Sequence, residues 1–382
     1  MARRLRMAVV GLGAAGRHHC QAMVEAVPQM HLAAVVEAAP EVAESVSTRY
    51  GVPAFGSCRE LIRSGVCEAV TLATPHTCHA EVAVECLRAG LHVLCEKPLA
   101  ESVAQADRML RTARSAKRTL GCILQERFNP NFREARRLVR SGRLGQLMRA
   151  TLIHRDFRTQ TYYDSNVWGA TWKGEGGGVL LNQAPHHLDW LTQLAGCPKC
   201  VTGRLATRLH RIEVEDQADA LLTFASGATG YVLCSTCEPT HGNYLEIAGD
   251  RGRLVLDDDR LDVAVYGRGL RNLAARSRQM WCRPEARALK AGVRGCKTNH
   301  AMAMCDFARH VLHGSALVCD AASALASLEL ANAVVLSHFT GASVHLPTPR
   351  KSYAALLVRL QAASKPKQHV RVQRTTDPRM KR

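Results

Sequence analysis

The stretch LRMAVVGLGAAGRHHCQAMVEAV, residues 5–27, joins a short apolar run to a glycine-rich turn and then to a segment with helical periodicity. Its glycines are Gly11, Gly13 and Gly16. In a strand–turn–helix unit the first such glycine allows the tight turn, the second lets backbone approach a pyrophosphate, and the third permits close helix packing. The helix amino terminus then favours phosphate. The stretch predicts a dinucleotide-binding turn, with a purely structural glycine turn as the alternative.

A second apolar run, HLAAVVE at residues 31–37, follows the predicted helix and ends in Glu37. A carboxylate about 20 residues beyond the glycine turn is expected to bind the adenosine ribose hydroxyls. It would also repel a 2′-phosphate, so we expect NAD rather than NADP.

Helical and apolar segments keep alternating up to CEKP at residues 95–98, which predicts a doubly wound parallel sheet. TPHTCH, residues 74–79, and CEKP end neighbouring strands on the edge where such sheets bind ligands. Lys97 then lies beside the nicotinamide, where it can bond to a substrate hydroxyl and help to move its proton. A solvent-facing lysine before a turn is the alternative. The expected cofactor-binding residues are Gly11, Gly13, Ala14, Ala15, Gly16, Glu37, Thr74, Pro75, His76, His79, Glu96 and Lys97.

Polar side chains also interrupt the apolar stretch GGGVLLNQAPHHLDWL, residues 176–191. If it forms one helix, Asn182, His186 and Asp189 share a face. Histidine suits proton transfer because its pKa lies close to working pH. His187 would point about 100° away and is expected to be structural. The alternative is a capped helix whose histidine is satisfied in the core.

The formal net charge of +18 is concentrated in two segments. Residues 268–297 hold nine Lys or Arg against one Glu, and residues 365–382 hold seven against one Asp. The second has almost nothing apolar to bury, and we expect a disordered tail. The first matches no nucleic-acid module and predicts a solvated surface or a rim that attracts anionic substrates. Nucleic acid is therefore not the expected partner; salt-sensitive binding through both segments is the hypothesis to test against it.

Length and composition place the chain among globular proteins, since 382 residues allow two separate cores and 47% are hydrophobic. We find no apolar run that approaches the roughly 20 residues of a membrane helix and no signal core, and we expect a cytoplasmic protein. Fifteen cysteines without a secretory signal indicate reduced thiols. Two CxxC pairs, at Cys197 and Cys200 and at Cys234 and Cys237, could bind zinc, but strand alternation separates the second pair and we expect no metal.

Four segments together resemble the glucose-fructose oxidoreductase / inositol dehydrogenase / rhizopine-catabolism (Gfo/Idh/MocA) family. They are VVGLGAAGRHH, ATPHTCHAEVAVECLRAGLHVLCEKPLA, YYDSNVWGATWKGEGGGVLLNQAPHHLDWL and SLELANAVVLSHFTGASVHLP, in family order between about residues 5 and 347. The resemblance implies an α/β protein in which an N-terminal Rossmann domain precedes an α/β domain with a large, open, mostly antiparallel sheet. It further implies a homodimer or homotetramer, often joined through that sheet. The corresponding division is a cofactor domain at 1–125, a substrate and oligomerisation domain at 126–348, and a helix with the basic tail at 349–382.

The resemblance also implies an activity. NAD would take hydride from a secondary alcohol on a sugar, polyol, inositol or nucleotide-sugar, with His186 accepting the hydroxyl proton and Lys97 assisting. Tyr163 and Trp168 would join Lys97, Asn182 and His186 in binding substrate.

Two positions depart from the family pattern. Asn182 replaces the common aspartate, and Trp168 is followed by Gly169 instead of arginine. Asparagine can orient the imidazole of His186 but cannot stabilise its charged form, and Asp189 is the remaining candidate for that charge. A non-catalytic NAD-binding sensor or scaffold of the same fold is therefore the alternative function.

Overall fold

A six-stranded parallel sheet forms the N-terminal part of the computed structural model, which describes residues 3–239, 242–258, 260–293, 297–365, 367 and 370. The strands follow the order β3-β2-β1-β4-β5-β6. They are β1 (Leu5–Val10), β2 (Met30–Val36), β3 (Ala54–Phe55), β4 (Ala69–Leu72), β5 (His92–Cys95) and β6 (Leu120–Cys122). The connecting helices are α1 (Ala14–Ala26), α2 (Pro40–Tyr50), α3 (Cys58–Ser64), α4 (His79–Arg88) and α5 (Val103–Ala116). The predicted doubly wound sheet is confirmed.

The strands form because nearly every residue in them is apolar and buried, as a sheet covered on both faces requires. Strand order reverses between β1 and β4, which pair in parallel. The two connections from these strands leave in opposite directions and open a crevice at their carboxyl ends. The glycine turn and the segment 74–79 both lie at this edge.

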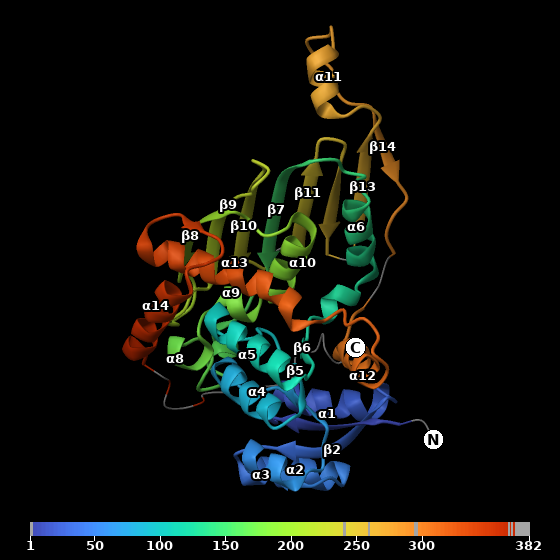
Figure 1. Cartoon of the computed structure of the whole chain (residues 1–382). Helices are drawn as coiled ribbons and strands as arrows, with labels where there is room; N and C mark the ends of the chain where they lie inside the picture. The colour runs from blue at the N-terminus through green and yellow to red at the C-terminus, as the bar shows by residue number, and fades with distance from the viewer. Residues whose placement is uncertain are drawn as a thin grey trace.

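A nine-stranded sheet forms the second layer system, in the order β14-β13-β12-β11-β7-β10-β9-β8-β15 (Figure 1). Only β7 and β10 pair in parallel. The strands are β7 (Leu147–Arg155), β8 (Cys200–Ala206), β9 (Gln217–Thr223), β10 (Thr229–Ser235), β11 (Asn243–Gly249), β12 (Gly252–Asp257), β13 (Arg260–Tyr266), β14 (Ala286–Leu289) and β15 (Val344–His345). The expected large, mostly antiparallel sheet is thus confirmed.

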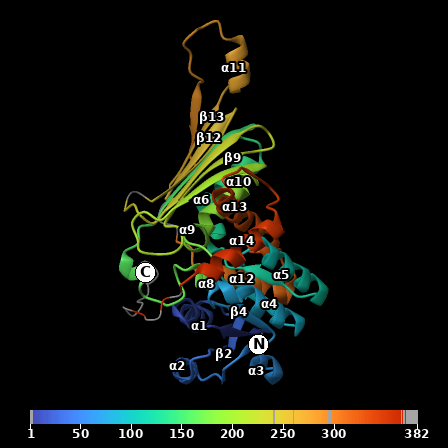
Figure 2. The same cartoon turned by 90° about the vertical axis from the view of Figure 1, so that its left-hand side faces the viewer.

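Helices α6 (Pro130–Arg140), α10 (Pro185–Ala195) and α13 (Ala321–Thr340) cover one face of this sheet (Figure 2). Among the described residues no helix covers the opposite face. Strand β8 ends at Ala206, because residues 207–216 turn back around the carboxylate of Asp216.

The chain returns to the Rossmann sheet after the second sheet is complete. Helix α12 (His300–His313) packs on α1, although it lies within the range that we assigned to the second domain. Helix α14 (Arg350–Ala363) packs on α5 and on the short helix α8 (Trp172–Glu175). Segments from the end of the chain therefore brace both domains.

Helix α13 corrects one expectation. It has 20 residues and a mean hydropathy of 1.3 over its most apolar window, so by length and composition it could cross a membrane. Within the fold 67% of that window is buried, against β8 and α10. Its interruptions by serine, glutamate and asparagine hid a continuous apolar helix, and the statement that no apolar run approaches membrane length is wrong.

The basic segment forms an arm that projects from the edge of the second sheet (Figures 1 and 2). Helix α11 (Leu270–Arg276) buries no residue, and the side chain of Trp281 is 89% exposed. Residues 294–296 of this segment lie outside the described residues. So does the basic tail apart from residues 365, 367 and 370, and its expected disorder stays a prediction.

A buried ion pair joins the segment that follows β6 to helix α10. Arg127, on the short helix η2 (Gln125–Phe128), donates from Nε to Asp189 Oδ2 at 2.8 Å and from Nη2 to Oδ1 at 2.6 Å. Its Nη1 donates to the carbonyl of Val318 and to Ser323 Oγ at 2.8 and 2.7 Å. The guanidinium therefore binds three separate segments, and the charge of Asp189 is neutralised here rather than at His186.

We predict that Arg127→Met lowers the free energy of unfolding by about 3–5 kcal/mol, because it leaves the Asp189 carboxylate buried without a partner. Arg127→Met combined with Asp189→Leu should recover most of this loss. Urea denaturation followed by circular dichroism measures both. Equal stability of the single and double variants would contradict the assignment.

Candidate active site

The glycine turn has the shape that a dinucleotide requires. Gly11 has φ +87°, and a Cβ there would lie 2.8 Å from the carbonyl oxygen of Ala73. A Cβ at Gly16 would meet the Gly11 oxygen at 1.8 Å, which shows how closely α1 packs on the turn. Gly13 faces open space and opens α1 without a side-chain cap, so the N–H groups of Ala14 and Ala15 are available to a phosphate.

Glu37 lies at the end of β2 and reaches back to this turn. Its Oε2 accepts from Leu12 N–H and its Oε1 from Ala38 N–H, each at 2.8 Å. A half-buried carboxylate held at the rim of the glycine turn fits the ribose-binding role that its position predicts.

In the segment after β4, Thr74 has a hydroxyl without a partner among the described residues, whereas His79 is used to hold neighbouring loops together. The buried Thr74 hydroxyl has no hydrogen-bond partner among the described residues, which fits a group that a ligand completes. His79, after Pro75, places Nδ1 2.9 Å from the Pro98 carbonyl and Nε2 3.0 Å from that of Thr74. Both ring nitrogens are thereby used to hold the two strand-end loops together.

Glu96 turns into the interior and binds two imidazoles. Its Oε1 lies 2.8 Å from His19 Nε2 and 3.4 Å from His300 Nε2, and its Oε2 accepts from Lys97 N–H. Although burial acts to raise it, the hydrogen bonds from these histidines hold the pKa of Glu96 well below its usual value. Because His300 belongs to α12, this carboxylate ties the EKP segment to the returning part of the chain.

Lys97 contacts the end of a short helix of the second domain. Its Nζ donates to the main-chain oxygen of Asn182 at 2.6 Å. Asn182 ends the short helix α9 (Val179–Asn182), so two residues far apart in sequence, both expected in catalysis, lie together. The Asn182 side chain donates from Nδ2 to the Glu175 carboxylate and, at 3.5 Å, to the Tyr162 hydroxyl.

His186 lies across a helix break from Asn182. Helix α9 ends and α10 begins at Pro185, so the continuous helix that we expected over Asn182, His186 and Asp189 is wrong; Pro185 cannot donate into a helix ladder. His186 Nε2 lies 3.3 Å from Gln125 Nε2, while its Nδ1 and Gln125 Oε1 are buried without a partner among the described residues. Burial, followed by the charge of Lys97, lowers the pKa of His186 to about 3.

A buried carboxylate that sequence reasoning missed supports the glycine triplet. Both oxygens of Glu215 accept from Gly178 N–H at 3.0 Å, and Oε1 also accepts from Leu180 N–H at 3.2 Å. A Cβ at Gly178 would come within 1.9 Å of the Glu215 carbonyl oxygen. Burial raises the pKa of Glu215 to about 7. The third glycine of the triplet thus lets α9 start directly above this carboxylate.

The aromatic loop before the triplet presents other side chains than expected. Tyr163 is buried, and its hydroxyl lies 2.8 Å from Thr236 Oγ1. Tyr162 instead brings its hydroxyl to Asn182, and Trp168 packs edge-on against His76 with ring centroids 5.6 Å apart. Trp168 thus lies against the cofactor-side segment, and of the two tyrosines it is Tyr162 that meets Asn182.

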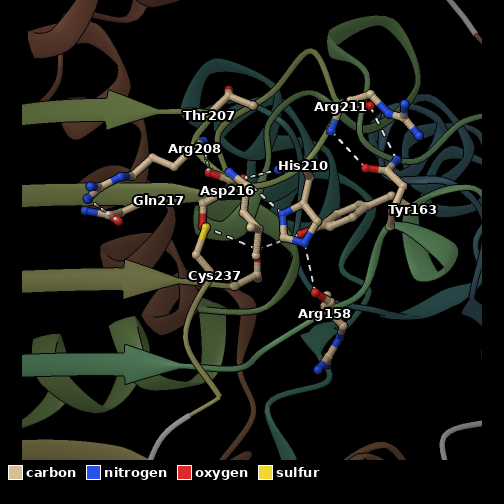
Figure 3. Close-up of polar contacts among 12 residues, drawn as sticks. Arg158, Tyr163, Thr207, Arg208, His210, Arg211, Asp216, Gln217 and Cys237 are labelled. Atoms are coloured by element: carbon tan, nitrogen blue, oxygen red, sulfur yellow. Dashed lines mark hydrogen bonds and ion pairs between the residues drawn. The ribbon is translucent and has the colours of Figure 1, made fainter.

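His210 fastens this loop to the second sheet (Figure 3). Its Nδ1 lies 2.9 Å from Asp216 Oδ2 and its Nε2 2.8 Å from the Arg158 carbonyl. Although burial acts to raise it, main-chain N–H donors and His210 lower the pKa of Asp216, which is therefore ionised. Both imidazole nitrogens therefore face acceptors, one on each side of the ring.

Two groups of possible metal ligands occur among the described residues, and in each the residues are engaged in hydrogen bonds. They are His19, Glu96 and His300, and His210, Asp216 and Cys237. Cys237 Sγ lies 3.8 Å from the main-chain oxygen of Asp216. The described cysteines are all free thiols.

The glycine turn, the acidic end of β2 and a lysine at the carboxyl edge of a Rossmann sheet define an NAD-binding oxidoreductase fold. Residues 5–123 match the oxidoreductase family with the NAD-binding Rossmann fold, and residues 132–255 match the GFO/IDH/MocA C-terminal domain. The chain belongs to the Gfo/Idh/MocA family, as its sequence motifs predict.

Curated relatives of the chain include dehydrogenases at modest identity. An uncharacterised oxidoreductase of Synechocystis sp. is 30% identical over 69% of this chain and 74% of its own length. Inositol 2-dehydrogenase of Leifsonia xyli is 32% identical over 51% of this chain and 54% of its own length. The chain thus spans about half of that enzyme.

Solved structures extend the likeness over most of the fold. The WlbA dehydrogenase of Bordetella pertussis, solved with NADH and UDP-GlcNAcA, has a TM-score of 0.79 at 25% identity, covering 91% of this chain and all of that one. A levoglucosan dehydrogenase solved with NADH has a TM-score of 0.76 at 22% identity, with the same coverage, and supports the fold alone.

We predict that Glu37→Ser weakens NAD binding about tenfold, which corresponds to the loss of roughly one charge-assisted hydrogen bond. The ratio of NAD affinity to NADP affinity should fall with it. Isothermal titration with each dinucleotide measures both constants. Glu25→Ser, at the exposed end of α1, is the control. An unchanged NAD constant would show that the carboxylate serves only the turn.

We predict that His186→Gln flattens the acid dependence of stability. The folded pKa of His186 is about 3 against 6.5 for a free histidine, so unfolding takes up a proton as pH falls below about 6.5. Stability falls accordingly, by up to about 1.4 kcal/mol per pH unit until the pH nears the folded value. Urea titrations across this range, with the exposed His313→Gln as control, measure the difference; parallel curves for wild type and His186→Gln would count against a buried neutral imidazole.

Proposed function

We propose that this protein is an NAD-dependent dehydrogenase that interconverts a secondary alcohol and a ketone on a sugar, polyol or nucleotide-sugar. The observation that carries the proposal is the hydrogen bond of 2.6 Å from Lys97 Nζ to the main-chain oxygen of Asn182. It lies at the carboxyl edge of the Rossmann sheet, where the glycine turn also lies. The partnerless Thr74 hydroxyl and the open space over Gly13 fit a bound dinucleotide, held by the turn, Glu37 and the segment after β4. Bound there, NAD supplies the hydride acceptor.

Lys97 and His186 divide the work on the substrate hydroxyl. The ammonium of Lys97 retains donors beyond its bond to Asn182, and it stabilises negative charge that develops on the oxygen. The low pKa of His186 keeps its imidazole neutral, so that Nε2 is able to accept a proton. Gln125 Nε2 lies 3.3 Å from this same nitrogen, so the substrate hydroxyl would replace that contact.

A nucleotide-sugar is the first substrate to test. The solved structure at 25% identity holds UDP-GlcNAcA together with NADH, and relatives that act on inositol make polyols the second class. The projecting basic arm fits an anionic substrate by long-range attraction. We further propose a cytoplasmic homodimer or homotetramer joined through the open face of the second sheet, and no nucleic-acid partner.

The alternative is an NAD-binding sensor without turnover. What favours it is that His186 has no carboxylate hydrogen-bond partner in the described part of the chain, because Asp189 is bound by Arg127 and position 182 is asparagine. The two functions differ in whether hydride moves.

We predict that Lys97→Met and His186→Ala each lower kcat by about 10²–10⁴-fold, the range typical of general acid–base groups, while the NAD dissociation constant of His186→Ala stays within about twofold of wild type. NADH formation near 340 nm with nucleotide-sugars, uronic acids, inositols and free sugars measures turnover, and titration measures binding. Tight NAD binding without reduction across the panel would establish the sensor instead.

A further inference from the structure

Glu175 connects three parts of the site. It is 2% exposed and ends α8, immediately before the glycine triplet. One carboxylate oxygen accepts from Asn182 Nδ2, and the other accepts from Ala170 N–H at 2.5 Å. Its main-chain oxygen lies 3.3 Å from His76 Nδ1. One residue therefore contacts Asn182 at the end of α9, Ala170 in the loop before the glycine triplet, and His76 in the segment after β4.

These bonds determine which way the Asn182 amide faces. The Asn182 amide turns its NH₂ group toward the Glu175 carboxylate, whose other oxygen accepts from Ala170 N–H, and toward the Tyr162 hydroxyl. The carbonyl oxygen Oδ1 then lies on the other edge of the planar amide. It is the side-chain atom of Asn182 left to accept a hydrogen bond from a ligand, in the residue whose main-chain oxygen accepts from Lys97 Nζ.

The same carboxylate holds the loop in an unfavourable backbone conformation. Ala170 has φ +60°, in the left-handed region that a residue with a Cβ avoids at a cost of about 1–2 kcal/mol. Its N–H donates to Glu175 and its carbonyl accepts from Glu213 N–H at 3.2 Å. Loop conformation and amide orientation thus depend on one side chain.

We propose that Glu175 is a positioning residue that fixes the Asn182 amide as an acceptor for the substrate hydroxyl. The role in turnover rests on the proposed dehydrogenase activity, whereas the pairing of the two side chains does not. A carboxylate at both positions would place two buried negative charges in contact, so asparagine at 182 is the partner that Glu175 requires.

The pairing is tested by exchanging donor and acceptor. Glu175→Gln presents an NH₂ group where the carboxylate accepted from Asn182 or Ala170, and we expect kcat to fall about tenfold or more with an unchanged NAD constant. Asn182→Asp alone should be similarly impaired, although it restores the common family residue. In Glu175→Gln combined with Asn182→Asp the amide donates to the new carboxylate, and we expect kcat to recover by at least about threefold over either single variant.

A second readout needs no substrate. In Asn182→Asp the facing carboxylates share a proton, which raises their pKa values in the folded state, so stability is greater at low pH and is lost as pH rises. Between about pH 5.5 and pH 8 its melting temperature should fall by about 2–4 °C more than that of wild type. The double variant should follow wild type. Glu329→Gln, a buried carboxylate outside the site, is the matched control and should show no such excess.

The two readouts separate the two proposals. Multiplicative loss of kcat in the double variant, together with parallel melting curves for Asn182→Asp and wild type, overturns the role of Glu175 and leaves the dehydrogenase standing. The pH-dependent melting of Asn182→Asp, seen in a protein that reduces no NAD, supports the pairing and removes the enzyme. If Glu175→Gln does not fold, Glu175→Asp keeps the charge one methylene shorter, and its kcat should exceed that of Asn182→Asp; the reverse order also contradicts the proposal.

Discussion

The site depends first on the buried ion pair between Arg127 and Asp189. It joins the segment that leaves the Rossmann sheet to the helix that carries His186, and the same guanidinium binds the loop before α13. Two ions without solvent are stable only with good geometry and with their remaining donors satisfied, and both conditions are met here. These bonds hold α10, which carries His186, against the segment that follows the Rossmann sheet.

Buried carboxylates give the cleft its second constraint. Glu215 and Glu175 flank the glycine triplet and accept from main-chain or amide N–H groups on both of its sides. Glycine is required at position 178 because any side chain would displace the Glu215 backbone. The triplet therefore lets the start of α9 lie against Glu215, and this contact sets where Asn182, at the other end of α9, is placed.

The sequence predicts what short-range patterns encode. Apolar runs, a glycine turn and helical periodicity predicted the Rossmann sheet, because each βα unit forms mostly from neighbouring residues. The family motifs pointed to Lys97, Asn182 and His186, and the fold places the first two in contact. Strands β11 to β14 were not foreseen because their partners are set by distant pairing rather than by local alternation. Glu175, Glu215 and His210 were missed for the same reason: a polar residue in a loop looks solvated until the fold brings hydrogen-bond partners to it. Tyr163 and Tyr162 show the limit of resolution, since a shift of one residue exchanges a buried side chain for one at the cleft.

Electrostatics explains why an amide at position 182 is compatible with proton transfer. With Asp189 neutralised by Arg127, the charges that the structure places near His186 are Lys97, which lowers the imidazole pKa, and Glu96, which raises it less. A weakly basic histidine favours proton acceptance only if the alcohol itself becomes more acidic, and a neighbouring ammonium produces that change by stabilising the alkoxide. In the proposed dehydrogenase the asparagine adds an acceptor for the hydroxyl without adding a charge that would bind Lys97 and reduce its effect. On that proposal, the departure from aspartate places more of the work on the lysine than on the histidine.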